Sequence, residues 1–324
     1  MTTSTAPPSG GTDGVIAPRE GTIVVRGLGH RFGDKVALED GLELAVEAGG
    51  VVGLLGPNGS GKSTLMRLLV GLVPLERGAV TVDGVPLEKD GLGVRRRVTY
   101  APGELHLYGE LTGGEHLSML LRARTAEALR RARETAEELG LPLDRMVRGY
   151  SHGMKRQLVF AAAMAPAVRV RILDEISEGL DPAKRSQILD HIERDAASGT
   201  TILLSSHHLG EVDRACQRII FLSAGRIIAD ETAAAVRARA ARVLKLRFPE
   251  GADGEAIAAA LRGADVAALS QEEGVFRLVL QEEDPRPFLG RLAAAKGLPA
   301  PLSVEHGRLS LRELYRSLYG VEGT

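Results

Sequence analysis

The stretch VVGLLGPNGSGKST, residues 51–64, decides the fold of this chain. The run at 51–56 is continuously apolar apart from its glycines, which is typical of a strand buried on both faces of a parallel sheet. Residues 56–63, GPNGSGKS, match the pattern G-x-x-x-x-G-K-[ST], and a helical pattern follows at once. Strand, loop and helix in this order predict a phosphate-binding loop and therefore a nucleoside-triphosphate site.

The residue types in this loop explain its chemistry. Gly56, Gly59 and Gly61 lack a Cβ, so backbone N–H groups can approach a phosphate closely. The helix that begins near Lys62 adds the positive end of its dipole. Lys62 is expected to contact the β- and γ-phosphates, and the Ser63 hydroxyl to ligate Mg²⁺. The predicted binding set is Gly56, Pro57, Asn58, Gly59, Ser60, Gly61, Lys62, Ser63 and Thr64.

A second motif, RILDEISEGLDP, occupies residues 171–182. Asp174 ends an apolar strand, where an aspartate can hold the Mg²⁺ shell, and Glu175 can take a proton from an attacking water. Two carboxylates at a strand end are also common on protein surfaces. The phosphate-binding loop upstream favours the catalytic interpretation.

Composition limits the possible functions. Hydrophobic residues make up 44% of the 324 residues and the formal net charge is −1, so the chain can bury a core and lacks the basic excess of a nucleic-acid-binding protein. The single cysteine excludes an internal disulfide. No apolar stretch reaches the roughly 20 residues that span a bilayer, and residues 1–18 do not resemble a signal peptide. A membrane role would therefore need a partner.

Strand and helix patterns alternate along most of the chain. Strands are expected at 168–174, 200–206 and 218–228, with helices between them, which predicts a largely parallel α/β sheet. Residues 231–242 have the pattern of a helical connector. The order beyond it is βαββαβ plus a terminal helix at 310–320, which is close to a ferredoxin-like unit.

These motifs together resemble the ATP-binding-cassette (ABC) ATPases, the nucleotide-binding subunits of ABC transporters. The resemblance covers about residues 22–240 and rests on GPNGSGKST, YSHGM (150–154), ILDEISEGLDP and LLSSHHL (203–209), in the order typical of the family. It implies a P-loop NTPase fold with a RecA-like core and a helical subdomain, ATP as substrate and Mg²⁺ as cofactor. We accordingly predict a disordered tail (1–20), an ABC cassette (21–240) and a C-terminal accessory α/β domain (241–324).

The resemblance also assigns residues that would contact ATP from a second subunit. Ser151, His152 and Gly153 match the signature loop, which contacts the γ-phosphate held by the opposite cassette. Asp181 matches the D-loop. Read alone, Ser151 is simply the cap of a helix that runs on through 158–165.

Two further residues acquire expected roles in the same way. His207 matches the switch histidine that reaches the γ-phosphate, so Glu175 and His207 form the expected catalytic pair. Phe32 occupies the place of the aromatic residue that stacks on adenine. The ordinary alternatives are a core phenylalanine and a histidine at the end of a strand.

The sequence departs from the pattern of the ABC family at several positions. His152 stands where the family has glycine. Gly103 stands at the glutamine of the Q-loop, so that either the neighbouring Glu104 takes over the metal contact or the contact is lost. Arg171 lies in a strand where an apolar residue is expected. A buried arginine is costly unless paired, so Arg171 should have a carboxylate partner or lie at an exposed strand end.

Residues 100–117 and 309–320 resemble a branch of ATPases that pair with separate ABC-2-type permeases, mostly bacterial exporters and including the daunorubicin-resistance group. That branch implies an ATP-hydrolysing exporter subunit, working as a homodimer of cassettes on the cytoplasmic face of the membrane. The exported compound would be a drug, an antibiotic or a lipid, and no nucleic-acid partner is expected. Two alternatives are a regulatory cassette with impaired catalysis and a soluble ABC ATPase outside transport.

Overall fold

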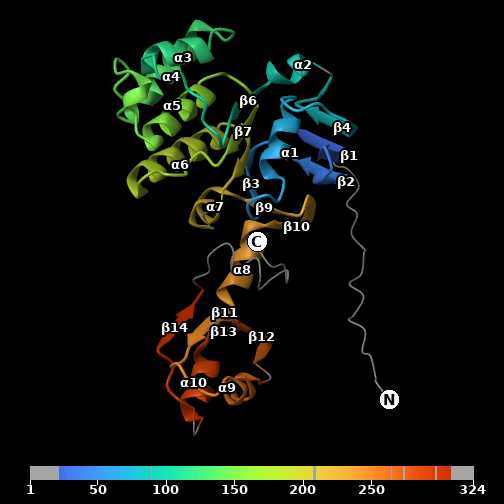
Figure 1. Cartoon of the computed structure of the whole chain (residues 1–324), viewed down its shortest axis with the longest axis vertical. Coiled ribbons are helices and arrows are strands. Elements are labelled where there is room, and N and C mark those ends of the chain that lie inside the picture. Colours follow the sequence, from blue (N-terminus) through green and yellow to red (C-terminus); the bar gives the residue numbers. More distant parts are fainter. Residues whose placement is uncertain are drawn as a thin grey trace.

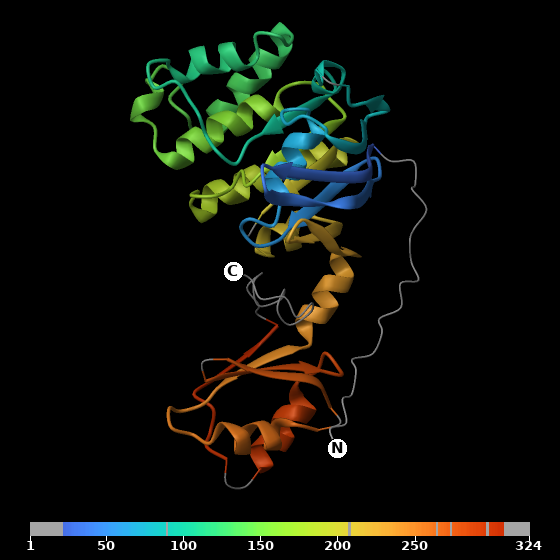
Figure 2. The ribbon, with the colours of Figure 1, turned by 45° about the vertical axis from the view of Figure 1, so that its right-hand side comes forward.

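The computed structural model shows two bodies joined by a single helix (Figures 1 and 2). It describes residues 22–307 except 89, 207–208, 264, 273 and 296–297. The tail predicted at 1–20 and the helix predicted at 310–320 lie outside the described residues. Among the described residues, no helix combines the length and the apolar character that crossing a membrane requires.

The larger body is built on a six-stranded sheet in the order β10-β9-β3-β8-β7-β6. Its strands are β3 (Gly50–Leu55), β6 (Val98–Ala101), β7 (Val170–Asp174), β8 (Thr201–Ser205), β9 (Arg218–Ser223) and β10 (Arg226–Thr232). All neighbours are parallel except β9 and β10. Every residue of β7 and β8 is buried, as expected of strands covered on both faces. The predicted parallel α/β sheet is confirmed.

One strand prediction was wrong. Residues 218–228 do not form one strand, because the chain reverses at Ala224 and Gly225, whose φ angles are 44° and 76°. The reversal makes β9 and β10 an antiparallel hairpin at the sheet edge. Positive φ at two successive residues is the geometry of the tight turns that join such hairpins.

A second, antiparallel sheet in the order β2-β1-β4-β5 packs beside the first. Its strands are β1 (Ile23–Phe32), β2 (Lys35–Val46), β4 (Arg77–Val82) and β5 (Val85–Pro86). Apolar residues of this sheet share a core with β3 and with α1 (Lys62–Leu69), the helix of the phosphate-binding loop. A short α2 (Leu92–Arg95) follows β5. Because the two sheets share this core, Phe32 at the end of β1 belongs to the same body as the phosphate-binding loop.

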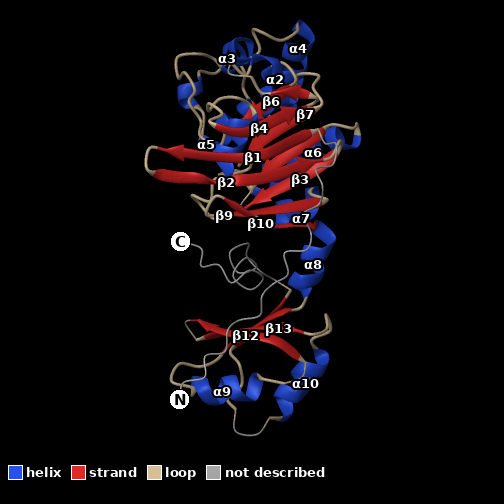
Figure 3. Cartoon of the chain, turned by 90° about the vertical axis from the view of Figure 1, so that its right-hand side faces the viewer, coloured by secondary structure: helices blue, strands red, loops and turns tan. Residues whose placement is uncertain are grey.

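A helical subdomain lies on the other side of the large body, at the top of Figure 3. It contains α3 (Gly113–Leu120), α4 (Ala126–Glu138), the 3₁₀ turn η1 (Val147–Gly149) and α5 (His152–Met164). A capping box starts α3, as the spacing of Thr112 and Glu115 in the sequence favours. Thr112 Oγ1 accepts from the Glu115 amide at 3.2 Å, and the Glu115 carboxylate accepts from the Thr112 amide at 2.8 Å.

Three further helices complete the body: α6 (Pro182–Ala197), α7 (Leu209–Ala215) and α8 (Ala233–Ala241). The helical connector predicted at 231–242 is α8. Val236 and Ala240 of α8 are buried in the same core as α6 and β8, so the connector packs on the large body. Figure 1 shows α8 leading directly into the smaller body.

The smaller body has one antiparallel sheet in the order β12-β13-β11-β14. In chain order its elements are β11 (Val243–Arg247), α9 (Gly254–Leu261), β12 (Val266–Glu272), β13 (Val275–Leu280), α10 (Arg286–Ala294) and β14 (Ser303–His306). This is the βαββαβ arrangement of a ferredoxin-like unit. Both helices lie on one face of the sheet, where Leu244, Phe276 and Leu278 form the core (Figure 3). The division of the chain at residue 240 stays a prediction.

Candidate nucleotide-binding site

The phosphate-binding loop joins the carboxyl end of β3 to α1, as its sequence requires. Gly59 and Gly61 have φ angles of 77° and 106°, in the left-handed region that favours glycine. A Cβ added to Gly61 would lie 2.6 Å from the Ala37 carbonyl oxygen, so no other residue fits there. The Ser60 amide donates to the Pro57 carbonyl at 3.2 Å and closes a turn. The loop is therefore a preformed cradle whose amide groups can face an anion.

Lys62 is buried at the first position of α1, with 5% of its surface exposed. Its Nζ donates to the carbonyl oxygens of Gly56 at 2.8 Å and Pro57 at 3.0 Å. Burial lowers the pKa of Lys62, and the charges of Glu175 and Asp174 oppose that shift. A phosphate in the loop would supply the full negative charge that this buried ammonium needs, so the residues present fit a nucleotide.

Asp174 is fully buried at the carboxyl end of β7. The Ser205 hydroxyl, from β8, donates to Oδ1 at 2.6 Å, and the Tyr100 hydroxyl, from β6, lies 3.5 Å from Oδ2. The two strands that flank β7 thus each supply one hydroxyl to the same carboxylate. These two hydrogen bonds hold the Asp174 carboxylate in one orientation, on the side of the sheet where β3 also has its carboxyl end. The carboxylate oxygens could therefore help to hold Mg²⁺.

Glu175 follows in the left-handed region, with φ at 47°. For a residue with a side chain this conformation costs about 1–2 kcal/mol. The Glu175 amide offsets part of this cost by donating to the Ser205 carbonyl oxygen at 3.2 Å and Oγ at 3.0 Å. The strand therefore ends sharply, and strain of this kind is typical of functional sites.

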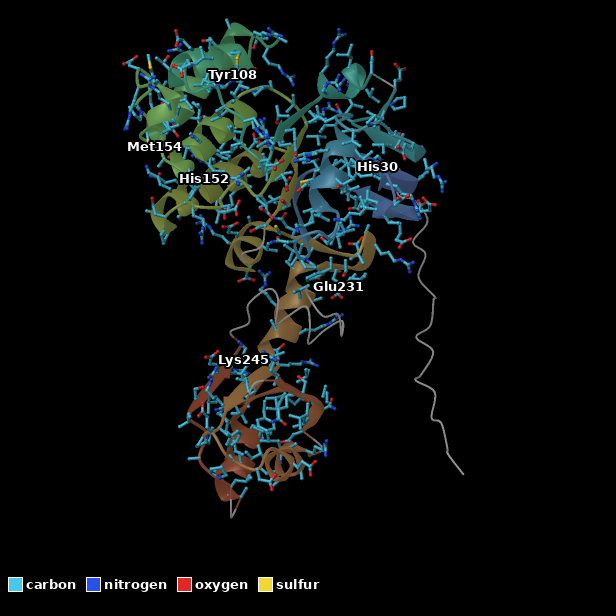
Figure 4. All side chains as sticks on the ribbon, in the orientation of Figure 1. His30, Tyr108, His152, Met154, Glu231 and Lys245 are labelled. Atoms are coloured by element: carbon cyan, nitrogen blue, oxygen red, sulfur yellow. The ribbon has the colours of Figure 1, made fainter. Side chains whose placement is uncertain are left out.

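The N-terminus of α5 carries the predicted signature residues. Ser151 caps the helix, as predicted, because its Oγ accepts from the Met154 amide at 3.2 Å. Ser151 and His152 are exposed. Figure 4 places His152 and Met154 on the helical side of the body, away from α1 in Figure 1. Within one chain, the signature residues and the phosphate-binding loop are not brought together.

The signature loop instead packs on the turn between β7 and α6. A Cβ added to Gly179 would lie 2.8 Å from Cδ2 of His152, and one added to Gly153 would lie 3.1 Å from Leu180. Asp181, at the end of this turn, caps α6 by accepting from the Lys184 amide at 2.9 Å. The residues that follow Glu175 are therefore in direct contact with the predicted signature.

Buried Arg156, on α5, forms hydrogen bonds to the turn that follows β7 and to the Q-loop segment. Its guanidinium donates to the Glu178 carboxylate at 2.7 Å and to the Pro102 carbonyl at 3.4 Å. Sequence reasoning missed this residue, as it missed Tyr100 and Ser205. Ser205 lies within the LLSSHHL motif, which is a signal that could have identified it, whereas Arg156 and Tyr100 stand out only through their contacts.

The Q-loop segment contacts the site through its backbone. A Cβ added to Gly103 would lie 3.3 Å from Oδ2 of Asp174, so Gly103 lies directly against the carboxylate. The Glu104 carboxylate lies 3.2 Å from Nη2 of Arg67, on α1, and its side chain is 71% exposed. The structure thus pairs Glu104 with a cation.

Arg171 has the carboxylate partner that its position predicted. Its side chain is buried in β7, and Nε and Nη2 donate to the two oxygens of Asp195, on α6, at 2.6 Å and 3.2 Å. Nη1 donates to the Ala163 carbonyl at 2.7 Å. Arg171 thus departs from the family pattern, and every nitrogen of its buried guanidinium donates a hydrogen bond.

Phe32 ends β1 with 52% of its surface exposed. Its ring meets that of buried His30 edge to face, with centroids 4.6 Å apart. One face of the ring is thus supported while much of it stays accessible, which suits a stacking platform. His207 lies outside the described residues.

A groove of about 250 Å³ lies between the large sheet and the helical subdomain. Its lining includes Leu72, Tyr100, Leu105, Leu120, Arg95 and Arg124. Leu72 and Leu120 are 55% and 43% exposed. The groove therefore combines an apolar floor with two cations.

Comparisons with known proteins agree with this geometry. A family model described as "ABC transporter" matches residues 40–178. The daunorubicin/doxorubicin resistance ATP-binding protein DrrA of Streptomyces peucetius is 34% identical over 290 residues, 87% of either chain. DrrA3 of Streptomyces coeruleorubidus is 40% identical over 222 residues, which cover 67% of this chain and 70% of that protein. A solved ATP-binding subunit of an ABC transporter is 32% identical with a TM-score of 0.61, and the match covers 67% of this chain and 92% of that one.

Proposed function

Because this chain belongs to the ABC transporter family of ATP-binding proteins, we propose that it drives export through a separate membrane permease. As a member of that family it binds ATP and hydrolyses it. One observation carries the proposal. Strands β3 and β7 run parallel on either side of β8. The phosphate-binding loop and the Asp174–Glu175 pair therefore both lie at the carboxyl ends of the strands, on the same side of the sheet.

Each residue has a proposed task toward ATP. The amides from Gly56 to Thr64 cradle the phosphates, and Lys62 neutralises the β- and γ-phosphates. Ser63 and Asp174 would hold Mg²⁺, which offsets phosphate charge when bound. Glu175 accepts the proton of the attacking water. His207 is proposed to contact the γ-phosphate on the strength of the family resemblance.

We propose that the active form is a homodimer. Figure 4 places His152 on the helical side of the body, away from α1 and the loop of its own chain. The N-terminus of α5, which carries the signature residues, offers the positive end of its dipole to an anion. A second copy related by a two-fold axis would bring these residues to the γ-phosphate, with Asp181 at the same interface. The two-fold axis makes two equivalent sites. ATP would then hold the two cassettes together until hydrolysis.

Replacing Phe32 tests the adenine contact. Phe32→Ala is expected to raise the dissociation constant for ATP by about 5- to 30-fold, because stacking of one base on an aromatic ring contributes about 1–2 kcal/mol. Calorimetric titration of ATP into the purified chain would measure the change. Phe32→Tyr keeps the ring and serves as the control. Equal affinities for wild type and Phe32→Ala would show that Phe32 is only structural.

The groove beside the helical subdomain is the proposed docking surface for the permease, which we propose to be of the ABC-2 type. Leucines such as Leu72 and Leu120 would meet an apolar segment, while Arg95 and Arg124 favour acidic side chains on it. Docking there would hold the chain peripherally on the cytoplasmic face of the membrane. We propose a drug, an antibiotic or a lipid as the exported compound, and the relatives named for daunorubicin resistance favour a drug.

Recovery from membranes tests this surface. The double variant Leu72→Asp/Leu120→Asp is expected to reduce the membrane-bound fraction of the tagged chain, in its native host, by at least about fivefold. Leu92→Asp is the matched control, because Leu92 is 50% exposed and lies outside the groove lining. Unchanged recovery of the double variant, together with unchanged co-purification of a polytopic membrane protein, would exclude the groove as the docking surface.

A further inference from the structure

The second oxygen of the Asp174 carboxylate faces Tyr100. The hydroxyl of Tyr100 lies 3.5 Å from Oδ2, while Ser205 holds Oδ1 at 2.6 Å. Tyr100 reaches this position because β6 pairs with β7 in a register that sets Tyr100 opposite Ile172, two residues before Asp174. The contact therefore follows from the pairing of two adjacent strands of the sheet.

Arg67 also interacts with the hydroxyl of Tyr100. Burial, followed by the negative charge of Asp174, raises the pKa of Tyr100 to about 12, against a lowering by its hydrogen bond with Arg67. Burial alone would lower the pKa of Arg67, but its hydrogen bonds to Tyr100 and Glu104 raise it. The Tyr100 hydroxyl is therefore placed to donate to the Asp174 carboxylate, at 3.5 Å from Oδ2.

The Q-loop segment supplies no competing side chain. Gly103 has none, and a Cβ added there would lie 3.3 Å from Oδ2 of Asp174. Glu104 pairs with Arg67, which itself contacts Tyr100. Glu104 therefore interacts with Arg67 and does not contact the Asp174 carboxylate directly.

We propose that Tyr100 is a positioning residue that orients the Asp174 carboxylate for Mg²⁺, an inference that rests on the proposed function. In this proposal Glu104 does not contact the metal. Tyr100 also lines the groove proposed for the permease. A segment that enters the groove would therefore contact the ring whose hydroxyl touches the metal-binding carboxylate. This gives a direct physical route from partner to nucleotide site.

Magnesium dependence tests the assignment. The purified full chain is titrated with Mg²⁺ in the presence of a non-hydrolysable ATP analogue, and analogue binding is followed by calorimetry. Tyr100→Phe removes only the hydroxyl and is expected to raise the Mg²⁺ concentration for half-maximal binding by about 3- to 10-fold. Binding without Mg²⁺, and the thermal unfolding temperature, are expected to match wild type.

Two variants make the result specific. Tyr108→Phe removes a hydroxyl from an exposed tyrosine eight residues along and is expected to leave the Mg²⁺ requirement unchanged. Glu104→Gln is expected to change it less than twofold. A Mg²⁺ requirement of Tyr100→Phe equal to wild type, or a larger rise in Glu104→Gln than in Tyr100→Phe, would overturn the proposal. A wild-type chain that bound no analogue, with or without Mg²⁺, would overturn the proposed function as well.

Discussion

Glu175→Gln is expected to lower the rate of ATP hydrolysis by about 10²–10⁴-fold while ATP binding persists. The amide matches the carboxylate in size but cannot accept a proton from the attacking water. The strained backbone at this position, with φ at 47°, is equally accessible to either residue, so the turn should be preserved. Phosphate release from the chain assembled with its permease, together with calorimetric ATP binding, would measure the two effects separately.

The control for this experiment is a chemically identical change elsewhere. Glu193→Gln alters an exposed carboxylate of α6 that pairs with Arg214 at 2.8 Å, and it should hydrolyse ATP at the wild-type rate. If Glu175→Gln also turned over at the wild-type rate, another group would be the general base. If wild type showed no turnover with its permease, the regulatory interpretation of this cassette would be favoured.

Asp195→Ala is expected to lower the free energy of unfolding by about 3–5 kcal/mol, because it leaves the buried guanidinium of Arg171 without a counter-charge. Arg171 is 3% exposed, and both oxygens of Asp195 accept from it. Urea unfolding, followed by the loss of helical circular dichroism, would measure the change as a lower midpoint.

Two further variants separate charge from packing. Replacing both partners, as in Arg171→Leu/Asp195→Leu, should recover most of the loss, since apolar side chains of similar size can replace a buried ion pair. Glu193→Ala, which breaks the exposed pair with Arg214, should cost less than about 1 kcal/mol. A loss from Asp195→Ala no larger than that of Glu193→Ala would show that Arg171 finds another partner or reaches solvent.

Local patterns along the chain predicted much of this protein. The phosphate-binding loop, the capping box at Thr112 and the cap at Ser151 each depend on residues within a few positions of one another. The βαββαβ order of the smaller body also follows from successive short patterns. Antiparallel β2 and the hairpin at Ala224 do not follow from such patterns, because both depend on where the chain reverses.

The sequence by itself determined the chemistry of the nucleotide loop, the two carboxylates at the end of β7 and the family of the chain. Only the tertiary structure decided which side chains meet there. Arg171 and Asp195 are 24 residues apart, and Tyr100 and Asp174 are 74 apart. The Tyr100–Asp174 pair forms because β6 and β7 align at a register set by the packing of the whole sheet, and the Arg171–Asp195 pair forms because α6 packs on that sheet. No short stretch of sequence contains either arrangement.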